Sequence, residues 1–308
     1  MVKATREAYG EALAELVKEN AKVVVLDADV AGSTKSAIAQ KAVPERFFDM
    51  GIAEADMIGH AAGLAASGYI PFASSFAMFA TGRAWEQIRN SLAYPQLNVK
   101  VCGSHAGITV GEDGESHQAI EDIAIIRAIP GMRIMVPADA AETKAVVKYA
   151  ARIKGPVYIR TGRVGVADVY DDNKHFDFSK INAVRKGTKV AVFACGIMVS
   201  AALQAAEILK VKGIDLTVVD VCCIKPIDEE GVVEVLKNHD EIFTVEEHNV
   251  IGGLGGLICE IASERVPRPI HRMGMKDRFA ESGPWKDLLV KYGLDGDGVA
   301  KEILEHLK

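Results

Sequence analysis

The sequence has no excess of basic residues and no long apolar run. Its 308 residues include 36 Lys and Arg against 42 Asp and Glu, so the formal net charge is −6. That balance excludes the broad positive field that attracts nucleic acid. No run of about 18 apolar residues could span a bilayer, and residues 1–10 lack the apolar segment of a signal peptide. We expect a cytoplasmic protein that binds neither nucleic acid nor membrane.

Cysteine is also scarce. The five cysteines are an odd number and form neither a C-x-x-C pair nor a zinc-ligand spacing. Most of them lie in apolar runs, which favours buried free thiols in a reducing compartment. Hydrophobic residues make up 49% and charged residues 25%. This is ordinary globular composition, so a core can form without disulfides.

What the sequence does contain is a regular alternation of short apolar runs and amphipathic segments. This alternation predicts a parallel sheet covered by helices on both faces. In the first half the expected strands are residues 22–26, 98–102, 132–136 and 157–160, with a shorter one before Ser74. The expected helices there are residues 5–19, 53–66, 83–93, 119–129 and 140–153.

A polar, acidic stretch without a clear period, residues 168–182, predicts a linker with a boundary near residue 180. After it, strands are expected at residues 189–194, 215–221, 241–245 and 269–273, and helices at 198–211, 229–238, 255–265, 284–292 and 298–307. The predicted fold is α/β. It has two parallel or mostly parallel sheet domains, residues 1–180 and 181–308.

The loop formed by residues 103–118 is the segment richest in chemistry. It follows an expected strand and precedes an expected helix, which places it where open α/β sheets bind ligands. Its side chains include two histidines and three carboxylates, His105, Glu112, Asp113, Glu115 and His117. Such a set can exchange protons near neutral pH. A solvated acidic loop with incidental histidines is the alternative, but loops of this length are usually functional.

Three further features each allow two interpretations. Glu54 is either a helix-dipole partner at the start of residues 53–66 or a half-buried carboxylate with a tuned pKa. Phe76 and Phe79 are either core residues, which composition alone favours, or a wall for a flat heterocycle. Arg6, Arg160 and Arg163 are either phosphate ligands or surface ion-pair partners. Residues 252–256 and 295–298 are glycine-rich and are interpreted as a helix-entry turn and a turn, respectively.

Taken in order, these segments resemble the C-terminal portion of transketolase. The motifs that carry the resemblance are ATR (4–6), DADVAGST (27–34), GIAEADM (51–57), PFASSFAMFATGR (71–83), SHAGITVGEDGESHQ (104–118), YIRTGR (158–163), VDVCCIKPID (219–228), TVEEHNVIGGLGG (244–256) and YGLDGDGVAKEI (292–303). GEDGxxH with an upstream histidine is specific, and the resemblance covers essentially the whole chain.

The resemblance implies a thiamine diphosphate enzyme made of two chains. This chain resembles the part that binds the cofactor's aminopyrimidine. A separate N-terminal subunit would hold the diphosphate and a divalent metal, Mg²⁺ or Ca²⁺. By the same resemblance Glu54 is the carboxylate on N1′ of the pyrimidine, and Phe76 and Phe79 surround the ring. Asp29 lies where members place a carboxylate near the cofactor. A tyrosine present in some members falls near Gly82 here.

The resemblance further implies the substrates and the assembly. Arg6, Ser33, His105 and Arg160 match sugar-phosphate ligands, Asp113 matches a reader of a sugar hydroxyl, and His117 matches a hydroxyl and proton-transfer partner. Glu54, His105 and His117 are the expected catalytic residues. The implied reaction of the pentose phosphate pathway moves a two-carbon ketol unit from a ketose phosphate to an aldose phosphate. A homodimer formed through pyrimidine domains would become α2β2 with its partner.

Three alternatives stay open beside transketolase. A deoxyxylulose-phosphate-synthase-like split enzyme shares Glu54 and the region of Asp113 and His117, but usually has arginine in place of His105. A 2-oxoacid dehydrogenase β subunit has similar length but needs no sugar-phosphate site. A non-catalytic scaffold paralogue is disfavoured because Glu54, His105, Asp113 and His117 are intact.

Overall fold

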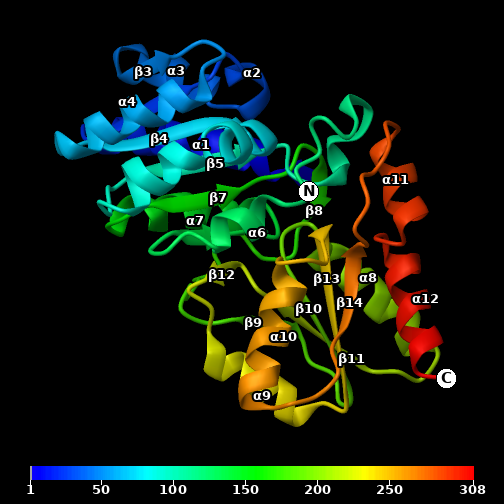
Figure 1. Ribbon diagram of the computed structural model, residues 1–308. Coiled ribbons are helices and arrows are strands. Elements are labelled where there is room, and N and C mark those ends of the chain that lie inside the picture. The colour runs from blue at the N-terminus through cyan, green and yellow to red at the C-terminus, as the bar shows by residue number, and fades with distance from the viewer. Residues whose placement is uncertain (1) are drawn as a thin grey trace.

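The computed structural model describes residues 2–308, which form two mostly parallel sheets flanked by helices (Figure 1). The predicted α/β class is confirmed. The seven-stranded sheet has the order β12, β6, β7, β5, β4, β2, β3, and the five-stranded sheet has the order β14, β13, β10, β11, β9. A separate antiparallel pair joins β1 (Val2–Ala4) to β8 (Gly165–Ala167).

Six strands of the first sheet run parallel, which matches their uniformly apolar sequences. They are β2 (Val23–Asp27), β3 (Phe47–Asp49), β4 (Ile70–Phe76), β5 (Lys100–Ser104), β6 (Arg133–Met135) and β7 (Val157–Arg160). One face packs against α1 (Thr5–Glu19), α3 (Ala37–Ala42) and α7 (Ala140–Arg152). The other face packs against α4 (Glu54–Ala66) and α6 (Asp122–Arg127).

The segment predicted as one α-helix, residues 83–93, is irregular. A π-helical turn over Phe79–Arg83 precedes the short helix α5 (Trp85–Gln87), and a second π-helical turn covers Ile88–Ala93. Gly82 lies in the first turn, where a glycine weakens a regular helix. Such insertions often occur at functional sites. The shorter elements of this half are α2 (Ala31–Thr34) and the 3₁₀ segments Pro44–Arg46 and Ile108–Asp113.

The second sheet repeats the pattern on a smaller scale. Its parallel strands are β10 (Val190–Ala194), β11 (Leu216–Asp220), β13 (Glu241–Asn249) and β14 (His271–Met275), and β9 (Asn182–Arg185) is an antiparallel edge. Helices α8 (Met198–Val211), α11 (Trp285–Tyr292) and α12 (Gly296–His306) share a core on one face. Helices α9 (Glu229–Asn238) and α10 (Leu254–Arg265) cover the other.

The two halves share one apolar core rather than meeting at a thin interface. The core on the α9 and α10 face also contains Met57 and Ile58 of α4 and Ile126 of α6. Strand β12 (Cys223–Lys225) comes from the second half but pairs antiparallel with β6. The expected linker packs against the first half of the chain. Phe178 of the linker contacts the Tyr149 ring of α7. The boundary near residue 180 stays a prediction.

Among residues 2–308, no helix combines the length and apolar character needed to cross a membrane.

Candidate functional site

The candidate site lies at the edge of the first sheet where strands β2, β4, β5 and β7 end. The register places Phe76 beside Ser104, so His105 follows directly beyond the end of its strand. Two non-glycine residues that follow these strands have positive φ, Asp29 at 61° and His105 at 56°. Such backbone conformations are uncommon and cluster at functional sites.

Two phenylalanines and two histidines form a single group of rings at this edge. Phe76 stacks on Phe79 with centroids 5.9 Å apart, and on His105 with centroids 4.1 Å apart. The His117 ring lies edge-on to Phe79, with centroids 5.1 Å apart. Phe76 is buried and Phe79 is half-buried. The structure therefore brings together the phenylalanine segment and both histidines of the loop 103–118.

Glu54 joins this group through an arginine. It is the first residue of α4 and is 4% exposed, and its Oε1 lies 3.1 Å from Nη1 of Arg83. The Arg83 guanidinium in turn lies 4.1 Å from the Phe79 ring centroid. Glu54 therefore has the helix-dipole position and is also a buried carboxylate beside an aromatic wall.

Arg6 fixes the far side of the ring group. Its Nη1 donates to Ser33 O at 2.8 Å and lies 3.1 Å from Nε2 of His105. Because a guanidinium only donates, Nε2 accepts, and Nδ1–H donates to Ser104 Oγ at 2.9 Å. Burial first, then the charges of Arg6 and Arg163, lower the pKa of His105 to about 3. The His105 imidazole is therefore neutral at physiological pH.

The expectation for Arg160 needs correction. Its side chain is 7% exposed, and its Nε donates to Asp122 Oδ2 at 2.8 Å. Its Nη2 donates to the backbone oxygens of Ala119 and Glu247. The guanidinium is thus committed to a buried ion pair between the two halves of the molecule. It is not presented to a sugar phosphate.

Arg163, three residues later, is the more open of the two arginines. Its side chain is 33% exposed and its Nη1 donates to Val110 O. The same nitrogen lies 3.5 Å from Asp113 Oδ2 and 3.4 Å from a carboxylate oxygen of Glu112. Arg163 follows the end of β7, whereas Arg160 lies within the strand. Position relative to the strand end was the signal that separates the two arginines.

The remaining predicted residues lie at the rim. Asp29 is exposed, and its backbone N–H donates to Asp49 Oδ1 at 3.2 Å. Asp113 is exposed at the end of the 3₁₀ segment Ile108–Asp113. The structure thus joins Glu54, Phe76, Phe79, His117, His105, Arg6 and Ser33 by contacts and leaves Asp29 to one side.

Sequence reasoning missed a residue from the second half that holds the loop. Glu247 of β13 accepts the backbone N–H of Thr109 through Oε1. A Cβ at Gly107 would lie 2.4 Å from that oxygen, and Gly107 has φ 82°. Only glycine fits there. The charged run EEH at residues 246–248, directly after the largely apolar run IFTV, was the available signal.

The residue set fits an aromatic nitrogen heterocycle. A buried carboxylate accepts a ring N–H, the phenylalanines supply stacking surface, and Arg6 and Arg163 supply positive charge for an anionic substituent or substrate.

Comparison with known proteins identifies the family of the chain. The description "Transketolase, pyrimidine binding domain" matches residues 2–167, and "Transketolase, C-terminal domain" matches residues 179–299. A Methanocaldococcus jannaschii protein described as a transketolase C-terminal section is 50% identical over 309 residues, covering 99% of this chain and 97% of that one. One of the subunits of the apulose-4-phosphate transketolase of Phocaeicola vulgatus is 38% identical, covering 99% and 98%.

A solved structure described as a split-gene transketolase in an inactive β4 tetramer matches with a TM-score of 0.89 and 50% identity, over 98% of this chain and 97% of that one. Human transketolase is 36% identical, covering 97% of this chain but 48% of its own length. The chain therefore belongs to the transketolase family of thiamine diphosphate-dependent enzymes. It corresponds to the C-terminal section of a split transketolase.

Proposed function

We propose that this chain is the C-terminal subunit of a two-chain transketolase that transfers a two-carbon ketol unit from a ketose phosphate to an aldose phosphate. The observation that carries the proposal is the set of contacts from Glu54 through Arg83 to the phenylalanines, and from these through both histidines to Arg6. One end suits a heterocycle and the other suits a phosphorylated sugar.

Thiamine diphosphate, when bound, supplies the electron sink for cleaving the bond beside the ketose carbonyl. On our proposal Glu54 holds the proton shared with the pyrimidine N1′. Phe76 and Phe79 orient the ring, with Asp29 at the rim. The stack of Phe76 on His105 would also exclude water from the side of the pyrimidine ring that faces these two side chains.

The substrate end is assigned to the remaining groups. Arg6 and Arg163 bind the sugar phosphate beside Ser33, with Arg163 in the role that the resemblance gave to Arg160. Neutral His105, together with His117 and Asp113, binds sugar hydroxyls, and His117 moves a proton at a substrate oxygen. The related subunit named for apulose-4-phosphate supports variety among the sugars that such chains accept.

The proposal includes a partner. An N-terminal subunit would bring the diphosphate site and its Mg²⁺ or Ca²⁺, and the assembly would be α2β2 built on paired pyrimidine domains. The near-complete coverage of relatives described as a C-terminal section and as a subunit supports this, as does a β4 relative described as inactive.

Reconstitution tests the proposal. The chain is assayed alone and with the candidate N-terminal subunit, thiamine diphosphate and Mg²⁺, using xylulose 5-phosphate with an aldose phosphate acceptor. We expect a new ketose phosphate only in the complete mixture. Turnover by the chain alone would refute the two-chain hypothesis. Product from pyruvate and an aldose phosphate, but not from a ketose donor, would favour a synthase. Inactivity of every complete mixture would favour a scaffold.

A further inference from the structure

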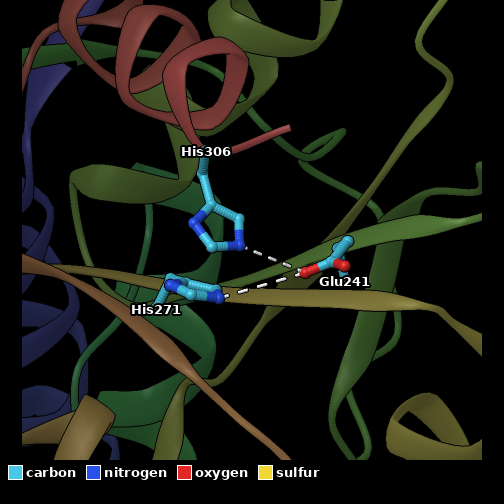
Figure 2. A group of neighbouring side chains, drawn as sticks. All are labelled: Glu241, His271 and His306. Carbon is cyan, nitrogen blue, oxygen red and sulfur yellow. Dashed lines mark ion pairs between the residues drawn. The ribbon is translucent and has the colours of Figure 1, made fainter. Parts of the chain in front are cut away.

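A second group of ligand-type side chains lies in the second half, at the other end of its sheet from the candidate site. Glu241 is the first residue of β13, His271 is the first residue of the neighbouring strand β14, and His306 is the last residue of α12. Figure 2 shows the three side chains converging from these elements, with both histidines directed at the carboxylate.

The distances are those of a convergent set. Glu241 Oε2 lies 3.4 Å from His306 Nε2 and 3.9 Å from His271 Nε2. One ligand atom from each residue lies within 4.8 Å of the other two. Within residues 2–308 this is the one group of three or more His, Cys, Asp or Glu side chains that meets this condition.

We propose that Glu241, His271 and His306 bind a divalent transition-metal ion, with Zn²⁺ the best fit. Two imidazole nitrogens and a carboxylate oxygen are a zinc donor set, with ligand bonds of about 2.0–2.2 Å. A tetrahedral ion with such bonds separates its ligand atoms by roughly 3.3–3.5 Å. The observed 3.4 and 3.9 Å are close to that separation. The two imidazole rings, whose centroids lie 3.3 Å apart, would turn away from each other so that both Nε2 atoms face one ion.

The surroundings favour a cation over protonated histidines. The two imidazole centroids lie only 3.3 Å apart, so two positive rings would repel each other. Phe243 packs against both rings, 5.2 Å from His271 and 5.5 Å from His306 between centroids.

The site is separate from the candidate active site. Glu241 begins β13, and Glu247, six residues further along the same strand, contacts the loop 103–118. At the usual rise per residue of a strand, these two glutamates lie about 20 Å apart. The metal would tie the last turn of α12 to the sheet, with one coordination position open to water. Its role is therefore structural, and it does not depend on the proposed function.

Calorimetry with untagged, chelator-treated full-length chain tests the proposal, with ZnCl₂ as the probe. We expect one ion per chain and a melting temperature that rises with zinc concentration. Co²⁺ substituted at the site should give the visible absorption of a tetrahedral ion. His271→Gln and His306→Gln should each weaken binding at least tenfold, while circular dichroism without metal shows that they remain folded.

The matched control is His60→Gln. His60 also lies near one carboxylate, 3.3 Å from Asp56, but within residues 2–308 it belongs to no convergent group of three such side chains. Zinc affinity should be unchanged in this variant. If wild type shows no saturable binding, or if zinc binds both His271→Gln and His306→Gln as tightly as wild type, the group is an ordinary ion-pair cluster and the proposal is wrong.

Discussion

The two sheets carry charged residues at the same place, the ends of their strands, but use them differently. At the first sheet, Phe79, His117 and Arg163 are partly exposed. At the second sheet, Glu246, Glu247 and His248 are at most 3% exposed and are bound by the protein itself. Both edges have the location expected for ligands in α/β folds. At the first edge these groups are left partly open for a ligand, whereas the three charged side chains of β13 are not.

The start of α10 shows how the second edge is filled. The Glu246 carboxylate accepts the backbone N–H of Leu254 at 2.7 Å and of Gly255 at 2.8 Å. A helix N-terminus of this kind is an anion site, and here the anion is a side chain of the same chain. A Cβ at Gly253 would lie 2.0 Å from Glu246 Oε2, so the turn needs glycine. The location of a site within the fold is therefore weaker evidence for ligand binding than the exposure of its polar groups.

Arg160→Ala should have the largest effect, and on stability. It removes the partner of the fully buried Asp122, and breaking a buried pair typically costs about 3–5 kcal/mol. Chemical denaturation measures the loss. Asp122→Asn added to Arg160→Ala should recover part of it, because the unpaired charge is removed. A stable Arg160→Ala with weakened phosphate binding would instead restore the first assignment of Arg160.

Glu54→Gln should preserve the fold and lower ketol transfer in the reconstituted enzyme at least 100-fold, which corresponds to about 2.7 kcal/mol of barrier. An amide cannot share the N1′ proton as a carboxylate does. Asp56→Asn is the matched control, since Asp56 lies in the same helical turn but is exposed. Steady-state rates of both variants decide the matter. Less than a tenfold loss for Glu54→Gln would remove Glu54 from the catalytic set.

Arg163→Ala should raise KM for a phosphorylated donor about tenfold with little change in kcat. A hydrogen bond to a charged group contributes about 1.5–3 kcal/mol, and a contact made equally in the ground state and transition state appears in KM. The loss should be much smaller with an unphosphorylated donor. If both donors lose equally, Arg163 does not recognise phosphate.

Much of the fold could be predicted from the sequence because its long elements have strong periods. The expected helices at residues 198–211 and 229–238 match α8 and α9 residue for residue. Short elements set by tertiary contacts were missed. Strand β12 has three residues and exists because it pairs with β6 across the two halves.

The candidate site was partly predictable for a related reason. Motifs on one loop, such as His105 and His117, were found from composition and spacing. The difference between Arg160 and Arg163 depends on which side chain meets Asp122, a residue on a helix 38 positions away in sequence. Glu247 reaches the loop from the other half of the chain, at a separation of 138 residues from Thr109. Local patterns mark these residues as unusual, but they do not say which distant residue each one contacts.

A pH-dependent effect is expected at a buried carboxyl pair between the halves. Glu142 of α7 and Asp220 of β11 are nearly inaccessible, and Asp220 Oδ2 accepts a hydrogen bond from Tyr170 OH at 2.6 Å. Burial raises the pKa of both carboxyls, that of Asp220 to about 7. The folded state therefore keeps a proton that the unfolded chain releases near pH 4. Stability from this proton is full below that pH and is lost as pH rises toward 7.

Asp220→Asn should flatten this dependence by up to about 1.4 kcal/mol per pH unit between pH 5 and 7. The side-chain oxygen of asparagine still accepts the Tyr170 hydroxyl, so the fold should persist. Free energies of unfolding in urea across that range measure the slope. Other buried carboxyls, including Glu247, add to the wild-type slope, so the difference between variant and wild type is the readout. Asp215→Asn, an exposed aspartate just before β11, is the control. Equal slopes for wild type and Asp220→Asn would show that Asp220 does not hold this proton in the folded state, and the proton would then be assigned to Glu142 or the pH effect abandoned.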